Sequence, residues 1–359
     1  NDLDPYRYIK EKYRSLRIFI AESIILELEN IYSSQSYKRV KTENIINNKN
    51  LKVIVKILIM LMPRVFLENI KDLENFSNRQ GLPNTNAKIF TGSSYHLCDT
   101  FCMYAALREK NETNKLFILQ HGGNFGMAES NSSEKHQRDI SDYYLTWGWK
   151  EDKKTLPIGI PKPLYKKDVI SKASHEVLLI TMELFRYKYL DMSAPQGTSW
   201  LDYQFLVEES FLRLQENKFN VLIRPQPVEG CWDSLKRWKK LSNNIDISND
   251  FHKLCRSSPI IISTYNAATY LETFAMNIPT IIFWDQTHWP LREEAQLFLE
   301  KLKQTNVFAS STEDLINTIT QAREIGYKKW WMEPKRQNAI NEFKNNYAFL
   351  PKSYSSSFI

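Results

Sequence analysis

The sequence predicts an α/β fold of two Rossmann-like domains that face each other across a central cleft. Short apolar runs of strand length alternate with segments of helical periodicity. The alternation stops in a charged, proline-containing stretch at 151–175 and then starts again. With 359 residues, the chain is also too long for one ordinary core. We therefore expect an N-terminal domain over 1–150 with a helical N-terminal segment, a linker over 151–175, a second domain over 176–330, and a C-terminal helix or tail over 331–359 that packs back on the first domain.

Elements of the first half follow from spacing and length. Residues 1–80 look mostly helical, because "IAESIILELENIY" places apolar residues at helical intervals. The run "IVKILIMLMP" is far shorter than the roughly 20 residues that span a bilayer, so it predicts a buried helix. Strands are expected at 87–94, 115–120 and 142–148, and a helix at 99–110.

The second half repeats the pattern with more strongly apolar strands. Strands are expected at 176–182, 219–225, 259–264 and 280–284, and helices at 202–216, 266–276 and 311–322. Ligands of such sheets bind beyond the carboxyl ends of the strands. Polar residues directly after a strand are therefore the candidates for a functional site.

The net charge of the chain limits the classes of binding partner that are expected. The formal net charge of +7 fits anionic substrates or the anionic face of a membrane, and no nucleic-acid motif is present. The four cysteines do not have the paired spacing of a metal site. Few cysteines and no recognisable leader suggest a cytoplasmic protein, with peripheral membrane contact as an option.

The first candidate site is "QHGGNFG" at 120–126. His121 comes just past a strand end, and Gly122 and Gly123 allow a sharp turn and a close ligand approach. Asn124 extends the same loop. His121 is a candidate general base, or a donor to an anionic substrate group. The alternative is a strand-ending turn with a solvent-facing histidine.

The second candidate site is "STYNAATYLET" at 263–273. Ser263 and Thr264 end a strand and Asn266 begins a helix, so hydroxyls, an amide and free helix N–H groups gather at an anion site suited to a nucleotide phosphate. Thr269 and Glu272 continue the polar side of that helix, and a carboxylate there could accept hydrogen bonds from ribose. The alternative is an ordinary capped helix with a solvated glutamate.

Other strand ends carry weaker signals. "IRPQP" places an arginine where it can pair with phosphate, and "TMELFRYKY" and "FWDQTHWPLREEA" follow two further strands. The candidate residues in these segments are Arg224, Gln226, Glu183, Arg186 and His288. No Walker loop, G-x-G-x-x-G, H-E-x-x-H or G-x-S-x-G motif appears, so nothing supports ATP hydrolysis, hydride transfer or serine-hydrolase chemistry.

Several of these blocks resemble a known family. "SSYHLCDTF", "LQHGGNFG", "YLTWGW" and "STYNAATYLETFAMNIPTIIFWDQTHWPLREEA" resemble bacterial transferases found with O-antigen and other surface-carbohydrate genes, over residues 88–348. More distantly, the pattern is similar to GT-B glycosyltransferases that use CMP-linked ulosonic acids such as Kdo and sialic-type sugars. Those enzymes bind the CMP phosphate with a basic-residue-Pro-His-Pro strand end and a Ser/Thr-rich turn. Here "RPQP" resembles the first, with Gln226 where histidine would stand, and "STYN" resembles the second.

The resemblance implies a cytoplasmic, metal-independent GT-B glycosyltransferase of lipopolysaccharide, O-antigen or capsule synthesis. It implies a CMP-linked donor as substrate, no cofactor, and a glycan or lipid-linked glycan as acceptor. Donor contacts would come from Arg186, Arg224, Gln226, Ser263, Thr264, Asn266, Thr269 and Glu272, and Asp99 or His121 would be the base. A glycosyltransferase using UDP, GDP or dTDP sugars, a nucleotide-sugar epimerase, and a non-catalytic carbohydrate-assembly subunit remain alternatives.

Overall fold

The computed structural model describes residues 49–61, 75, 88–91, 113–161, 174–187, 192–228, 230–248 and 250–351. The chain divides into two compact units, 1–116 and 117–359. In the first unit the described elements are α3 (Lys49–Leu61) and β1 (Lys88–Thr91). The domain boundaries expected from the sequence stay a prediction.

Two parallel arrays of strands form the framework of the second unit. In the first array, β2 (Lys115–Leu119) pairs with β3 (Tyr143–Thr146), and β3 pairs with β4 (Thr155–Pro157). The second is a five-stranded sheet of order β6-β5-β7-β8-β9. Its strands are β5 (Val177–Thr181), β6 (Val221–Pro225), β7 (Ile260–Ser263), β8 (Thr280–Phe283) and β9 (Phe308–Ala309). The predicted α/β class with parallel sheets is confirmed.

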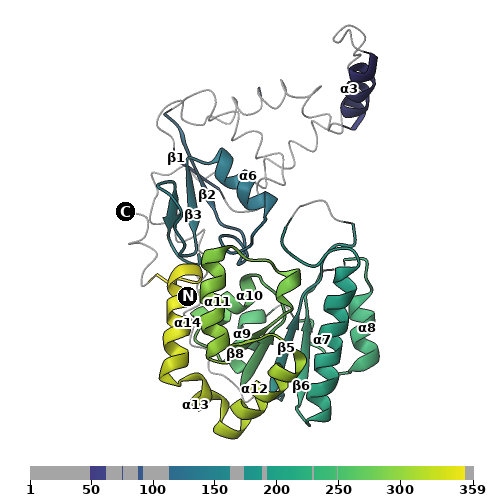
Figure 1. Cartoon of the computed structure of the whole chain (residues 1–359), viewed down its shortest axis with the longest axis vertical. Coiled ribbons are helices and arrows are strands. Elements are labelled where there is room, and N and C mark those ends of the chain that lie inside the picture. The colour runs from purple at the N-terminus through teal and green to yellow at the C-terminus, as the bar shows by residue number, and fades with distance from the viewer. Residues whose placement is uncertain are drawn as a thin grey trace. The chain divides into compact units, whose positions relative to one another are not determined.

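The strands of the second sheet form because they are continuous apolar runs. All residues of β5, β7 and β8 are buried, as expected for a parallel sheet covered on both faces. The helices of this part are α7 (Ser199–Glu216), α8 (Ser234–Leu241), α9 (Phe251–Ser257), α10 (Ala268–Ala275), α11 (Glu293–Gln304), α12 (Thr312–Ile325), α13 (Tyr327–Trp331) and α14 (Pro334–Tyr347). α7 packs against α12, while α10 and α11 pack against α14 (Figure 1).

The segment from α14 to Phe349 contacts residues that flank both arrays of strands. α14 packs on α10 and α11, and its Phe343 is fully buried beside Tyr270 and Phe274 of α10. After α14, the N–H of Phe349 donates to the carbonyl of Trp147 at 2.8 Å, and its carbonyl accepts from the N–H of Ile160 at 2.8 Å.

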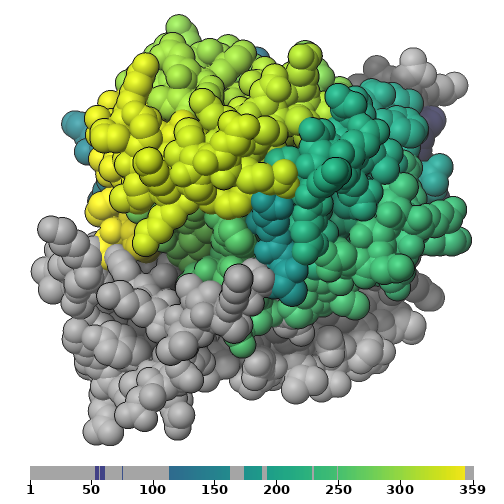
Figure 2. All heavy atoms as spheres, turned by 90° about the horizontal axis from the view of Figure 1, so that it is seen from below, coloured from purple at the N-terminus to yellow at the C-terminus, as the bar shows by residue number. Residues whose placement is uncertain are grey.

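The start of β5 is fixed by an ion pair. The carboxylate of Glu176 accepts two hydrogen bonds of 2.8 Å from Arg323 of α12 and one of 2.6 Å from Tyr327 of α13. Figure 2 shows the molecule from below, with yellow atoms of the C-terminal helices beside teal atoms from earlier in the chain.

Several sequence expectations need correction. The segment 54–61 is helical, as predicted, but it is not buried, because Val53, Ile54, Ile57, Leu58 and Met60 of α3 are each at least half exposed. The expected strands are present. Further elements were not expected from the sequence: α6 (Ser132–Ile140), α8, α9, α11, α13, β9 and β4, the last of which lies inside the expected linker.

No helix within the described residues has the length and apolar character needed to cross a bilayer.

Candidate functional site

The second sheet has a topological switch point between β5 and β7. The chain passes from β5 to β6 on one side and then returns to β7 on the other. In open parallel sheets the crevice beyond such a point is where ligands bind. Ile180 pairs with Ser263 in register, so β5 and β7 end at the same level. We call the turn at 263–268, which follows β7, the switch-point turn.

Two polar atoms of the switch-point turn are buried without a partner. Ser263 has an exposed fraction of 0% and Asn266 of 1%. Among the described residues, Ser263 Oγ and Asn266 Nδ2 find no hydrogen-bond partner. A buried polar group without a partner costs about 1–3 kcal/mol, so such groups are commonly reserved for a ligand or ordered water.

α10 begins without a side-chain cap. Its N-cap residue is Ala267, and no side chain accepts from its first turn at that position. The Asn266 carbonyl oxygen Oδ1 instead accepts from the Tyr270 hydroxyl at 3.0 Å. The ordinary capped helix considered as an alternative is therefore not what the chain forms. The first N–H groups of a helix are unsatisfied within the helix and attract anions.

Thr264 is bonded differently from Ser263. Its hydroxyl donates to the carbonyl of Ile180 at 3.0 Å and lies 2.8 Å from the hydroxyl of Tyr203. Tyr203 OH also accepts from the N–H of Met182 at 2.9 Å. Burial raises the pKa of Tyr203, which keeps the hydroxyl protonated. Thr264 and Tyr203 thus join the ends of β5 and β7 at the switch point.

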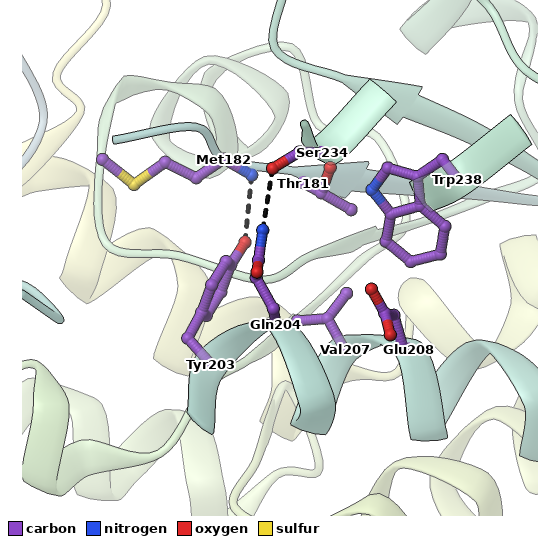
Figure 3. Close-up of a pocket in the computed structure, with 8 residues that line it drawn as sticks. All are labelled: Thr181, Met182, Tyr203, Gln204, Val207, Glu208, Ser234 and Trp238. Atoms are coloured by element: carbon purple, nitrogen blue, oxygen red, sulfur yellow. Dashed lines mark hydrogen bonds between the residues drawn. The ribbon is translucent and has the colours of Figure 1, made fainter. Parts of the chain in front are cut away.

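Tyr203 was missed by the sequence analysis, which treated 202–216 only as a helix. A cavity of about 10 Å³ lies beside it, lined by residues of β5, α7 and α8 (Figure 3). Gln204 Nε2 donates to Ser234 Oγ at 2.7 Å across this cavity. The space holds about one water molecule, so it is not a ligand site.

The glycine loop meets the switch-point turn through its backbone. A Cβ on Gly123 would lie 2.4 Å from the carbonyl oxygen of Ala267 and 2.7 Å from the nitrogen of Ala268. Only glycine permits this approach. Gly122, by contrast, has no neighbouring atom within 4 Å of an added Cβ. His121 is exposed, with its ring centroid 6.3 Å from that of Phe125.

The loop around His121 is shaped by Gln120, another residue that the sequence analysis did not single out. This buried side chain donates from Nε2 to the carbonyl of Gly122 at 2.7 Å. Its Oε1 accepts from the backbone N–H of Trp147 and from Trp149 Nε1, both at 2.9 Å. Gln120 therefore fixes the turn that presents the imidazole.

Glu134 and Arg292 hold the other end of the loop. Glu134 is fully buried; its Oε2 accepts from the N–H of Gly126 at 2.8 Å and its Oε1 from Arg292 at 2.7 Å. Arg292 also donates to the carbonyl of Ala128 at 3.0 Å. Asn124 Oδ1 accepts from Asn131 Nδ2 at 3.3 Å. The start of α6 had a signal in the sequence, because Asn131 and Glu134 have the spacing of a capping box. In the structure, Asn131 Oδ1 does accept from the N–H of Glu134.

The alternative interpretation of this helix required a solvated Glu272, but Glu272 is not solvated. Its side chain is buried in α10, and His252 Nε2 lies 2.5 Å from its Oε2. Thr269 is bonded to Tyr265 through their hydroxyls. Burial raises the pKa of Tyr265 to about 12. His252 was not singled out from the sequence, because nothing local links it to a residue 20 positions later.

The residues after β5 and β6 are linked to each other. Arg224 is buried and forms an ion pair with Asp246. Gln226 Oε1 accepts from the N–H of Glu183 at 3.1 Å, and Glu183 Oε1 accepts from the N–H of Gly230 at 3.2 Å. A phosphate bound here would compete with Asp246 for the guanidinium of Arg224.

The remaining expected residues lie further along these loops. Arg186 is exposed and stacks over Trp232 at 5.2 Å. His288 is half-buried in the short 3-10 helix η3 (Gln286–His288). Asp99, the alternative base, lies outside the described residues. Within the part that the structure describes, no three His, Cys, Asp or Glu side chains form a group that could hold a metal ion.

The chain matches one protein-family model over nearly its whole length. A model described as LIC12162 family transferase matches residues 9–355, which is nearly the whole chain. The chain belongs to this family. The expected transferase class is therefore confirmed, and the similarity begins near residue 9, well before the Lys88 expected from the sequence blocks.

Other comparisons are more distant. No curated protein matches the chain. Among solved structures, it is similar to MnaA of S. aureus in a co-structure with UDP, at 9% identity over 80% of this chain and 77% of that one, with a TM-score of 0.47. It is similar to the wall teichoic acid polymerase TagF at 10% identity, over 87% and 96%, with a TM-score of 0.43. It is also similar to MurG of Acinetobacter baumannii at 12% identity, over 89% and 86%, with a TM-score of 0.39. Likeness at this level does not assign an activity.

Proposed function

We propose that this transferase is a glycosyltransferase of the GT-B type, which moves a sugar from a nucleotide-linked donor to a surface-polysaccharide acceptor. One observation carries the proposal. Ser263 Oγ and Asn266 Nδ2, which find no hydrogen-bond partner among the described residues, lie buried beside the N-terminus of α10, at the switch point of a parallel sheet. A phosphate group offers the acceptor oxygens and the negative charge that such a place lacks.

The donor phosphate would lie against the switch-point turn. The first N–H groups of α10 and the side chains of Ser263 and Asn266 would meet the charge that develops on the leaving phosphate, without a metal ion. Glu272 would accept from ribose hydroxyls, with His252 orienting its carboxylate. Thr264 would act indirectly, because both of its hydroxyl interactions go to Ile180 and Tyr203.

The acceptor would be activated from the glycine loop. His121 would take a proton from the attacking hydroxyl, and Asp99 is the alternative base. His121→Ala should abolish transfer while nucleotide binding stays unchanged. Unchanged turnover in both His121→Ala and Asp99→Ala would reject both roles.

A nucleotide panel tests the donor site. CMP, CDP, UDP, GDP and dTDP are each added in excess, and a nucleotide that binds the folded state should raise Tm by a few degrees. We expect CMP to act best, in keeping with a donor carrying a Kdo or sialic-type sugar in lipopolysaccharide, O-antigen or capsule synthesis. A response to UDP, GDP or dTDP instead would identify a different donor class.

Variants locate the binding. Ser263→Ala and Asn266→Ala should each lose most of the nucleotide response. Ser210→Ala is the matched control, because Ser210 is equally buried but lies in α7 and donates to Leu206. No response to any nucleotide would contradict the proposal and favour a non-catalytic subunit. Conversion of the nucleotide sugar without acceptor would identify an epimerase.

A peripheral membrane contact of the first unit is part of the proposal. Supporting it, α3 exposes apolar side chains, among them Met60 at 73%, in a helix whose sequence also carries Lys49, Lys52 and Lys56. Exposed apolar residues with lysines are typical of helices that lie in an anionic interface. Ile54→Ser with Ile57→Ser should reduce co-sedimentation with phosphatidylglycerol vesicles; unchanged co-sedimentation would exclude α3 as the contact.

A further inference from the structure

An open pocket of about 680 Å³ lies on the second unit, and no site residue expected from the sequence lines it. Its size is within the usual range of ligand pockets. The lining residues come from the loop before α6, from α6 itself, from β3, β4 and the turn between them, and from the segment before α11. We call it the α6 pocket.

Charges of both signs line the α6 pocket in equal number. The four carboxylates are Glu129, Glu134, Asp139 and Asp152, and the four cations are Lys135, Arg138, Lys154 and Arg292. An anionic ligand would meet carboxylates in this wall, a cationic ligand would meet ammonium and guanidinium groups, and like charges repel in both cases. The balance favours a ligand without net charge.

Most of these charges are already paired with one another. Arg138 lies 2.7 Å from Glu151 and 3.5 Å from Glu134, and Lys135 pairs with Asp139 at 2.5 Å. These contacts hold donors and acceptors side by side along the wall. For Glu129 and Lys154, which are both exposed, no ion pair occurs among the described residues.

The chemistry of this wall matches a sugar. Each sugar hydroxyl has one donor and two acceptor lone pairs, and carboxylates supply acceptors while guanidinium and ammonium groups supply donors. We propose that the α6 pocket binds a neutral, polyhydroxylated saccharide. The identification of this saccharide as the acceptor rests on the proposed transferase function.

The α6 pocket is linked through Glu134 to the loop that carries His121. Glu134 is among the residues that line the pocket, and its carboxylate accepts from the N–H of Gly126 in the glycine loop. Arg292 also lines the pocket, and it donates to Glu134 and to the carbonyl of Ala128, which follows the glycine loop. A saccharide in the pocket would therefore lie beside the segment whose imidazole is the proposed base.

Binding of neutral sugars to the full chain tests the assignment. Saturation-transfer-difference NMR is recorded with neutral methyl glycosides and disaccharides, and with N-acetylneuraminic acid and glycerol phosphate as anionic probes. We expect at least one neutral sugar to bind, and its affinity to fall about tenfold in Lys154→Ala, the loss expected for one hydrogen bond to a charged group. Glu129→Gln should weaken it in the same direction.

Lys150→Ala is the matched control, because Lys150 is also an exposed lysine but does not line the pocket. The inference is overturned if no neutral sugar binds, if neither Lys154→Ala nor Glu129→Gln weakens binding, if Lys150→Ala weakens it as much, or if Lys154→Ala abolishes binding of an anionic probe instead. The nucleotide panel on the same proteins separates the two proposals. A normal nucleotide response without sugar binding rejects the pocket alone, whereas no nucleotide response rejects the proposed function.

Discussion

At the scale of single residues, two neighbouring glycines of one loop have different reasons to be glycine. The backbone of α10 touches Gly123 at a distance that leaves no room for a side chain, whereas Gly122 faces open space. The close contact joins the loop of His121 to the switch-point turn. Its strength is therefore a measure of how firmly the two halves of the proposed site are joined.

We expect Gly123→Ala to lower the free energy of unfolding by about 1–3 kcal/mol, because the added methyl group must push the backbone of Ala267 away. Gly122→Ala should change it by less than about 0.5 kcal/mol. Urea unfolding followed by circular dichroism measures both. Equal midpoints for the two variants would mean that the loop does not press on α10 as described.

The hydroxyls of Ser263 and Thr264 should affect stability in opposite directions. Ser263→Ala removes a buried hydroxyl that has no partner among the described residues, so the nucleotide-free protein should gain about 1 kcal/mol. Thr264→Val removes a hydroxyl bonded to Ile180 and Tyr203, so it should lose about 1–2 kcal/mol. Urea unfolding without nucleotide compares them, and a loss of similar size in both variants would show that Ser263 is bonded within the protein.

At the scale of elements, α9 is tied to the segment before β5 by a histidine. His175 is buried, and its Nε2 lies 2.8 Å from Ser258 Oγ at the end of α9. Burial lowers the pKa of His175, although the carboxylate of Asp246 acts in the opposite direction. The folded state therefore disfavours the protonated ring.

This shift predicts a loss of stability in acid. The unfolded chain takes up the proton at its ordinary pKa of about 6.5, before the folded state does, so stability falls as the pH drops through that value. In His175→Gln this contribution is absent, and carboxylates shared by both proteins cancel in the comparison. The stability of the wild type relative to His175→Gln should decline from pH 7.5 to 5.5 in urea unfolding. A constant difference over that range would show that the ring is not held neutral.

Elements differ in how well the sequence predicts them. β5, β7 and β8 were predictable because a buried parallel strand is a short, continuous apolar run. α6 was not, since "SSEKHQRDI" contains a single apolar residue. α8 was missed although "SLKRWKKL" places Leu235, Trp238 and Leu241 at helical spacing, so a signal for it was available in the sequence. β9 has only two residues and forms through pairing with β8.

Site residues follow the same division between local and distant causes. The switch-point turn was predictable because its polar residues are consecutive and follow a strand. Its supports were not, because Tyr203 meets Thr264 across 61 positions and Arg292 meets Glu134 across 158. Such pairs leave no pattern in a window of sequence, since the fold alone brings them together.

At the scale of the whole molecule, α14 is the part that connects the two arrays of strands. Phe343 packs on Tyr270 and Phe274 of α10, and Phe349 follows α14 and is bonded to Trp147 and Ile160. Disturbing α14 should therefore loosen both the switch-point turn and the segment after β3. The two proposed halves of the site would lose their common support.

Phe343→Ala tests this, with Phe211→Ala as its matched control. Both phenylalanines are fully buried, but Phe211 lies in α7 and packs on Trp238 of α8. Each truncation should cost about 3–5 kcal/mol. Hydrogen exchange under native conditions separates their local effects. Phe343→Ala should speed exchange in α10 and in residues 147–160 together, and Phe211→Ala should speed it in α7 and α8 while residues 147–160 stay protected. If both variants raise exchange equally at 147–160, the connection runs through the whole second unit and not through α14.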